Sequence, residues 1–112
     1  MTKLTFTSYQ DSVDGMPLYD DPLLGLAGEV GEVIELIKKD RRQGDRRKKV
    51  DTGDLTKELG DVLWYLTRVA SEYDIDLQII ADTNIEKLVI RHKVSEIKEK
   101  FPRVHEELAK DD

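Results

Sequence analysis

The chain has 112 residues, a formal net charge of -6, and 38% charged but only 6% aromatic residues. This length suits one domain rather than two, and the acidic excess argues against a general binder of nucleic acid or of anionic membranes. The lack of cysteine excludes disulfides, thiolate metal sites and a cysteine nucleophile, and no apolar run approaches the roughly 18 residues of a membrane span, so we expect a soluble, cytoplasmic protein.

A short helix is predicted near the N-terminus. Phe6, Tyr9 and Val13 recur at spacings of three and four, which is the spacing of one helix face. Thr5 or Thr7 is a suitable N-cap for it. A glycine and a proline follow closely and should end this helix.

The second predicted helix begins at Asp21-Pro22, where an N-cap is followed by proline at the first helical position. Apolar residues recur from there with helical period to about Lys39. Residues 41–49 then carry six arginine and lysine side chains around Gly44, which predicts a loop. Such a charge run is usually just solvated, although its positive charge could also steer an anionic substrate.

The third predicted helix follows a capping group at Asp51, and its apolar stripe covers residues 55–70. A fourth helical pattern covers residues 77–100 and ends before a proline. We therefore expect residues 1–103 to form a single all-α domain of four to five helices, and residues 104–112 to form a polar C-terminal tail.

Self-association is expected from the size and composition of the chain. A short, highly charged chain buries only a modest core by itself. A second copy would cover apolar helix faces that one chain leaves open, so we expect a homodimer or a homotetramer.

Two pairs of acidic residues mark the second and third helices. Glu29 and Glu32 are three residues apart, so they share one helix face, and Glu58 and Asp61 repeat that spacing. If the two helices pack antiparallel, the four carboxylates can converge on one point. Converging negative charges need protons or a cation to persist, and Mg²⁺ or Mn²⁺ is the cation that carboxylate oxygens suit best.

The alternative is an ordinary solvated surface, because acidic pairs at this spacing arise by chance in many acidic helices. The glycines around the pairs favour the metal site. Gly25, Gly28 and Gly31 in the second helix and Gly60 in the third are unfavourable in a helix interior, which suggests that a helix or a ligand approaches the backbone closely.

These residues resemble a known family. Residues 25–33, GLAGEVGEV, followed by residues 58–66, ELGDVLWYL, are similar to the paired motifs of the MazG-like nucleotide pyrophosphohydrolases, and the resemblance spans roughly residues 9–91. It implies an all-α bundle in which Glu29, Glu32, Glu58 and Asp61 bind Mg²⁺. It also implies a catalytic role for these four side chains in hydrolysing a nucleoside triphosphate to its monophosphate and pyrophosphate.

The resemblance extends to candidate substrate-binding residues. Asn84, Lys87 and Arg91 share one helix face and match the closing motif of that family, where the two cations would grip phosphate oxygens. Surface pairing with neighbouring acidic residues is the alternative for them. Trp64 is a candidate for stacking on the base, although an aromatic residue on an apolar helix stripe is more often packed in the core.

Two other functions remain open at this point. A phosphoribosyl-ATP pyrophosphatase shares the fold and the metal chemistry, and the sequence does not separate it from an enzyme acting on ribo- or deoxyribonucleoside triphosphates. A non-catalytic helical module that binds metal or a partner protein through its acidic face is the third interpretation. Release of pyrophosphate from a panel of substrates distinguishes the three.

Overall fold

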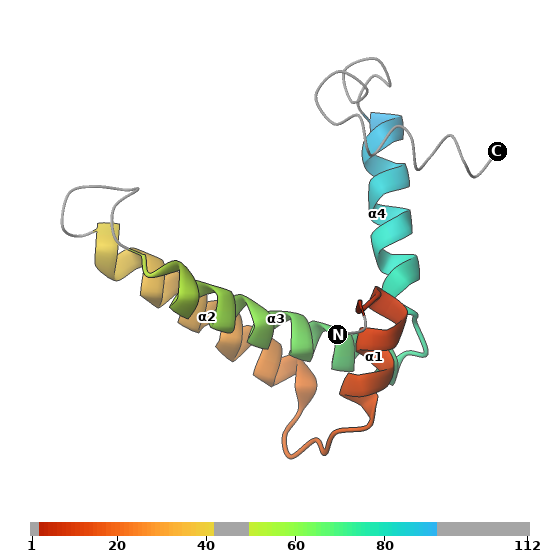
Figure 1. Ribbon diagram of the computed structural model, residues 1–112, viewed down its shortest axis with the longest axis horizontal. Coiled ribbons are helices and arrows are strands. Elements are labelled where there is room, and N and C mark those ends of the chain that lie inside the picture. The colour runs from red at the N-terminus through yellow and green to blue at the C-terminus, as the bar shows by residue number, and fades with distance from the viewer. Residues whose placement is uncertain (1–2, 42–49, 92–112) are drawn as a thin grey trace. The chain divides into compact units, whose positions relative to one another are not determined.

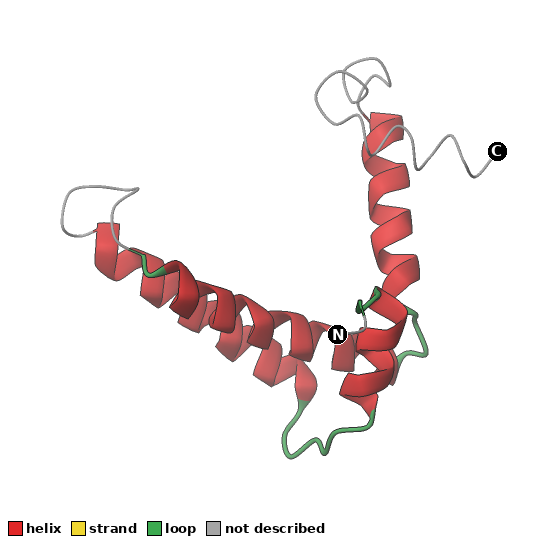
Figure 2. Ribbon diagram, in the orientation of Figure 1, coloured by secondary structure: helices red, strands yellow, loops and turns green. Residues whose placement is uncertain are grey.

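The computed structural model describes residues 3–41 and 50–91, and this part of the chain is all-α, as predicted (Figures 1 and 2). It contains four helices and no strand: α1 (Phe6–Asp14), α2 (Pro22–Arg41), α3 (Thr52–Glu72) and α4 (Leu77–Arg91). Residues 42–49 of the basic loop, the predicted continuation of the fourth helix and the predicted tail lie outside the described residues.

The chain separates into two compact units, residues 1–75 and residues 76–112. The first unit holds α1, α2 and α3, and the second holds α4. Among the residues described, no helix has both the length and the apolar character that a bilayer crossing requires.

Local capping groups start the helices where the sequence predicts. Thr5 and Ser8 form a reciprocal capping box at α1, with Ser8 Oγ accepting from the Thr5 N–H at 2.8 Å and Thr5 Oγ1 accepting from the Ser8 N–H at 3.0 Å. Asp21 Oδ1 accepts from the Leu23 N–H at 2.9 Å at the start of α2, and Asp51 Oδ1 accepts from the Gly53 N–H at 2.8 Å at the start of α3.

α3 ends in a Schellman motif. Asp74 adopts the left-handed backbone conformation (φ 55°), the Asp74 N–H donates to the Ser71 carbonyl, and the Ile75 N–H donates to the Ala70 carbonyl. The side-chain amide of Gln10 in α1 donates to the Ile75 carbonyl at 3.0 Å and to Ser71 Oγ at 3.1 Å. This end of α3 is therefore tied to α1.

α1 packs on α3 around a small buried centre. Val13 and Thr67 are fully buried, at 1% and 0% exposure, and Ala70 beside them is also buried. Arg68 Nη1 donates to the carbonyls of Val13 and Met16 at 2.9 and 3.0 Å. The guanidinium thus gives a second donor to the Val13 carbonyl at the C-terminal end of α1, which also accepts from the Met16 N–H, and a donor to the Met16 carbonyl in the loop that follows.

α2 and α3 lie side by side and run antiparallel (Figure 1). Apolar residues of both helices, such as Leu26 and Val62, are half-buried, and polar residues lie beside them. Other large apolar residues of the pair stay exposed, including Leu23 at 61%, Ile34 at 57% and Leu59 at 49%. Within the described part of the first unit, much of the apolar surface of α2 and α3 is therefore uncovered.

Candidate metal centre

Three carboxylates converge where α2 and α3 pair. Glu29 comes from α2, Glu58 and Asp61 come from α3, and the ligand oxygens of the three lie within 4.8 Å of one another. Glu29 and Glu58 are half-buried, and Asp61 is exposed. The helices meet the condition of antiparallel packing, and this brings three of the four predicted ligands together.

Glu32 lies outside this three-carboxylate group. It is exposed and stands one helical turn after Glu29 on α2. Its charge still reaches the group, because it is one of the charges that raise the pKa of Glu29. The prediction that Glu32 is a fourth metal ligand remains a prediction.

Electrostatic repulsion in the group acts most clearly on Glu29. Its pKa lies above the usual value, first because burial disfavours the charged form, and then because of the negative charges of Asp61, Glu58, Glu32 and Asp20. A cation placed among these carboxylates would remove both penalties, since it replaces lost hydration and offsets the repulsion. The electrostatics of the site therefore favour a proton or a metal ion.

The donor set fits a hard divalent cation. All three candidate ligands are carboxylates, and oxygen donors are the ones that Mg²⁺ and Mn²⁺ prefer. Two oxygens bound to one Mg²⁺ at about 2.1 Å lie at most about 4.2 Å apart. The observed limit of 4.8 Å is close to that separation.

Tyr65 and Asp20 adjoin the carboxylates, and the sequence did not indicate that they interact. The Tyr65 hydroxyl donates to the Asp20 carboxylate, with 3.2 and 3.1 Å to its two oxygens. This hydrogen bond, then burial, then the charges of Asp20, Glu29 and Asp61 raise the pKa of Tyr65. The nearby Tyr9 of α1 also has a raised pKa, first from burial and then from the charge of Asp61.

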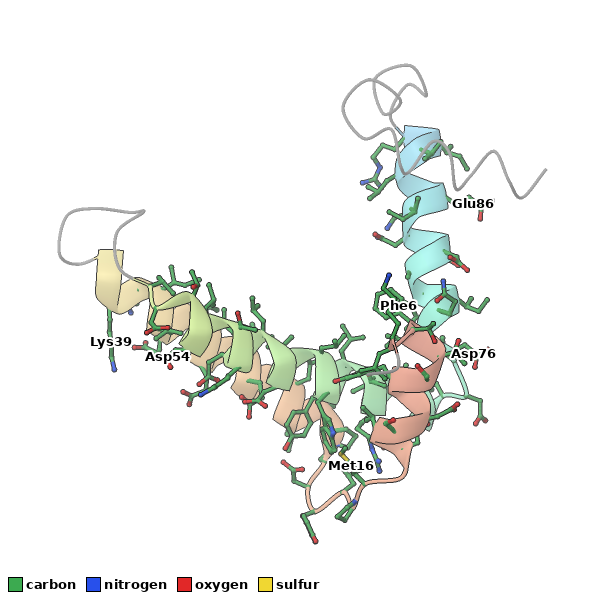
Figure 3. The ribbon with its side chains drawn as sticks, viewed as in Figure 1. Phe6, Met16, Lys39, Asp54, Asp76 and Glu86 are labelled. Carbon is green, nitrogen blue, oxygen red and sulfur yellow. The ribbon has the colours of Figure 1, made fainter. Side chains whose placement is uncertain are left out.

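Trp64 makes contacts within the protein on several sides. Its Nε1–H donates to Met16 Sδ at 3.4 Å, and its ring meets that of Tyr65 edge to face, with centroids 5.0 Å apart. The Arg68 guanidinium lies 5.4 Å from the centroid of the Trp64 ring. Met16 belongs to the loop between α1 and α2 (Figure 3). Of the two interpretations of Trp64, these contacts favour packing, and a role in stacking on the base remains a prediction.

The predicted phosphate-binding residues belong to the second unit. Asn84, Lys87 and Arg91 lie on α4 at spacings of three and four, and all three are exposed. Asp82, one of the neighbouring acidic residues on α4, accepts a hydrogen bond from the amide of Gln78 at 3.0 Å. Contact of these α4 residues with a substrate remains a prediction.

Glu35 is an acidic residue of α2 that lies outside the three-carboxylate group. It forms an ion pair with Lys38 at 3.9 Å, and both side chains are more than half exposed. Such a surface pair contributes little to stability. Glu35 is therefore a matched reference for substitutions at the centre.

Comparisons with known proteins bear on the same residues. The family model of the MazG nucleotide pyrophosphohydrolase domain matches residues 20–109, a range that contains all four predicted ligands. The Gene 37 protein of Mycobacterium phage L5 is 35% identical over 82 residues, which cover 72% of this chain and 69% of that protein, and its name states no activity. No solved structure matches the chain.

Proposed function

Because the chain belongs to the MazG nucleotide pyrophosphohydrolase family, we propose that it hydrolyses a ribo- or deoxyribonucleoside triphosphate to the monophosphate and pyrophosphate, using Mg²⁺ or Mn²⁺. The observation that carries this proposal is the convergence of Glu29, Glu58 and Asp61 within 4.8 Å. The family is generally dependent on divalent metal ions, and an oxygen-only donor set suits such an ion.

In the proposed mechanism, Glu29, Glu58 and Asp61 hold the cation, which when bound offsets the charge of the triphosphate and makes water more acidic. Glu32, exposed one turn along α2, is the fourth predicted ligand, and a carboxylate of this set accepts the proton of the attacking water. The water oxygen forms a bond to the α phosphorus, and the bond from that phosphorus to the α–β bridging oxygen breaks. Pyrophosphate leaves with the bonding electron pair.

We further propose that Lys87 and Arg91 of α4 bind phosphate oxygens, with Asn84 on the same helix face. A lysine supplies a mobile point charge and an arginine supplies two parallel N–H donors, so the pair suits a chain of phosphates. The exposure of all three side chains leaves them accessible to a ligand. Stacking of Trp64 on the base is the weaker part of this proposal, because its contacts with Met16, Tyr65 and Arg68 favour packing.

The test is pyrophosphate release from a panel of ribo- and deoxyribonucleoside triphosphates and phosphoribosyl-ATP, in Mg²⁺, Mn²⁺ or EDTA. We expect metal-dependent release, its loss in Glu58→Gln, and full activity in the reference variant Glu35→Gln. Release from phosphoribosyl-ATP alone would make the chain a phosphoribosyl-ATP pyrophosphatase. No release from any compound by a folded, metal-binding protein would indicate a non-catalytic binding module and overturn the proposal.

We also propose that the active form is a homodimer or homotetramer. The exposed apolar residues Leu23, Val30 and Ile34 recur on α2 at the heptad spacings of seven and four, which is the pattern of a helix-packing stripe. Ile34→Lys should lower the molar mass measured by light scattering after gel filtration. Leu24→Lys changes a leucine that is 71% exposed and lies off this stripe, so it should leave the mass unchanged.

A further inference from the structure

The aromatic ring of Tyr65 occupies the space beside Gly25, where any larger residue would carry its side chain. A Cβ built on Gly25 would lie 2.6 Å from Tyr65 Cζ and even closer to two other ring atoms, which is too near for unbonded carbons. Gly25 is in the first turns of α2 and has no left-handed backbone conformation to explain the glycine. Close approach of the ring explains it instead.

This contact is next to the three carboxylates along the helix pair. Gly25 precedes Glu29 by four residues on α2, and Tyr65 follows Asp61 by four residues on α3. Because the helices run antiparallel, the Gly25–Tyr65 contact lies next to the Glu29–Asp61 pair along the two helices. The separation is about 6 Å, at 1.5 Å per residue.

We propose that the Tyr65 ring, seated on Gly25 and anchored by Asp20, sets the register of α2 against α3 and thereby places Glu29 opposite Glu58 and Asp61. Gly25 and Tyr65 are then positioning residues for the metal centre, and this inference rests on the function proposed above. A slip of one residue moves α2 by about 1.5 Å and turns it by about 100°, which would carry Glu29 away from α3.

The anchoring to Asp20 keeps the ring in place. The tip of a tyrosine side chain could otherwise rotate away from an added methyl group. Both oxygens of the Asp20 carboxylate lie within 3.2 Å of the hydroxyl, so displacing the ring breaks these contacts. Asp20 belongs to the chain just before α2, and the same contact therefore joins the start of α2 to α3.

Other glycines of α2 supply the control. A Cβ on Gly31 would meet nothing within 4 Å, whereas one on Gly25 would overlap the Tyr65 ring. Gly25→Ala and Gly31→Ala make the same chemical change in the same helix and improve helix propensity equally. A difference in Mn²⁺ affinity between the two variants is therefore attributed to the contact with Tyr65.

The experiment measures Mn²⁺ affinity by electron paramagnetic resonance, without substrate. We expect Gly25→Ala to weaken Mn²⁺ binding about tenfold or more, as loss of a group that orients metal ligands does, and Gly31→Ala to change it less than about twofold. The double variant Gly25→Ala, Tyr65→Ala should bind no more weakly than Tyr65→Ala alone, because the ring that the methyl group displaces is gone. Normal affinity in Gly25→Ala, or independent effects in the double variant, would overturn the proposal.

A second measurement reads the register directly. The chain has no cysteine, so Lys39→Cys and Asp54→Cys can carry two spin labels. These exposed positions lie at the same end of the α2–α3 pair (Figure 3), and Asp54 precedes Tyr65 by 11 residues on α3. We expect the distance distribution between the labels to shift or broaden in Gly25→Ala and to stay unchanged in Gly31→Ala.

The two measurements separate this inference from the proposed function. If the native protein binds Mn²⁺ but hydrolyses no nucleotide, the function fails while the affinity series still tests the register. If it binds no Mn²⁺, the proposed function fails, and the distances between the spin labels alone test the register proposal. An unchanged distance in Gly25→Ala refutes the register proposal in either case.

Discussion

Replacing Glu29 by glutamine should stabilise the metal-free protein at neutral pH while removing its metal binding. Glu29 is half-buried, and its carboxylate lies within 4.8 Å of those of Glu58 and Asp61. With the screening of bulk water, two unit charges at 4.8 Å repel by about 0.9 kcal/mol, and salt lowers this further. Removing one charge that faces two others should therefore raise the free energy of unfolding by about 1 kcal/mol.

The pH dependence has a definite sign. Because the pKa of Glu29 is raised in the folded protein, the folded state binds this proton more tightly than the unfolded state does. The associated stability is fully present below the ordinary pKa of 4.5 and is lost as the pH rises through the raised value. The gain in unfolding free energy of Glu29→Gln should therefore appear at pH values above the raised pKa and vanish below pH 4.5.

Urea denaturation followed by circular dichroism, in EDTA at several pH values, measures the effect. A gain of about 1 kcal/mol moves the midpoint by about 0.3–1 M urea for the slopes of about 1–3 kcal/mol per molar that are typical of small proteins. Saturating Mg²⁺ should reverse the order, because the ion stabilises the native protein and not the variant. Glu35→Gln, which alters only an exposed pair with Lys38, should stay near the native midpoint. A midpoint for Glu29→Gln in EDTA at or below the native one would refute the repulsion argument.

Three further results are expected. Glu58→Gln should abolish Mn²⁺-dependent pyrophosphate release and leave the helical circular-dichroism signal intact. Activity at the native rate would show that Glu58 is not a required metal ligand. Arg68→Ala should cost about 2 kcal/mol in urea denaturation, because the guanidinium donates to the carbonyls of Val13 and Met16, and a loss below about 0.5 kcal/mol would show that solvent replaces it. Asp51→Ala should cost about 1 kcal/mol and lower protection from hydrogen exchange in the first turn of α3, since Asp51 caps the N–H groups of Gly53 and Asp54; unchanged exchange would contradict that role.

The helices could be predicted because their signals are local. Asp21-Pro22 and Asp51 begin α2 and α3 in the structure as their capping chemistry predicts, and the period of apolar residues gives each helix its extent. α2 continues to Arg41, two residues beyond the predicted end, where the lysine and arginine residues favour a helix about as well as leucine does.

The candidate centre could be predicted only in part. Spacings of three place Glu58 beside Asp61 and Glu29 beside Glu32 on any helix. Which of these four carboxylates meet depends on how α2 is rotated and shifted against α3. The structure groups Glu29 with both α3 carboxylates and leaves Glu32 one turn away.

The sequence by itself determined the helical segments, the N-terminal caps of the first three and two acidic pairs, because backbone hydrogen bonding and helical periodicity involve residues at most a few positions apart. Only the tertiary structure decided that Tyr65 sits on Gly25 and reaches Asp20, and that Arg68 caps the end of α1. These contacts join residues at least 40 positions apart, and they depend on the relative rotation of two helices. A glycine in a helix is a weak local sign of such a contact: the close approach expected at four helix glycines is found at Gly25, whereas a Cβ on Gly28, Gly31 or Gly60 would meet nothing within 4 Å among the described residues.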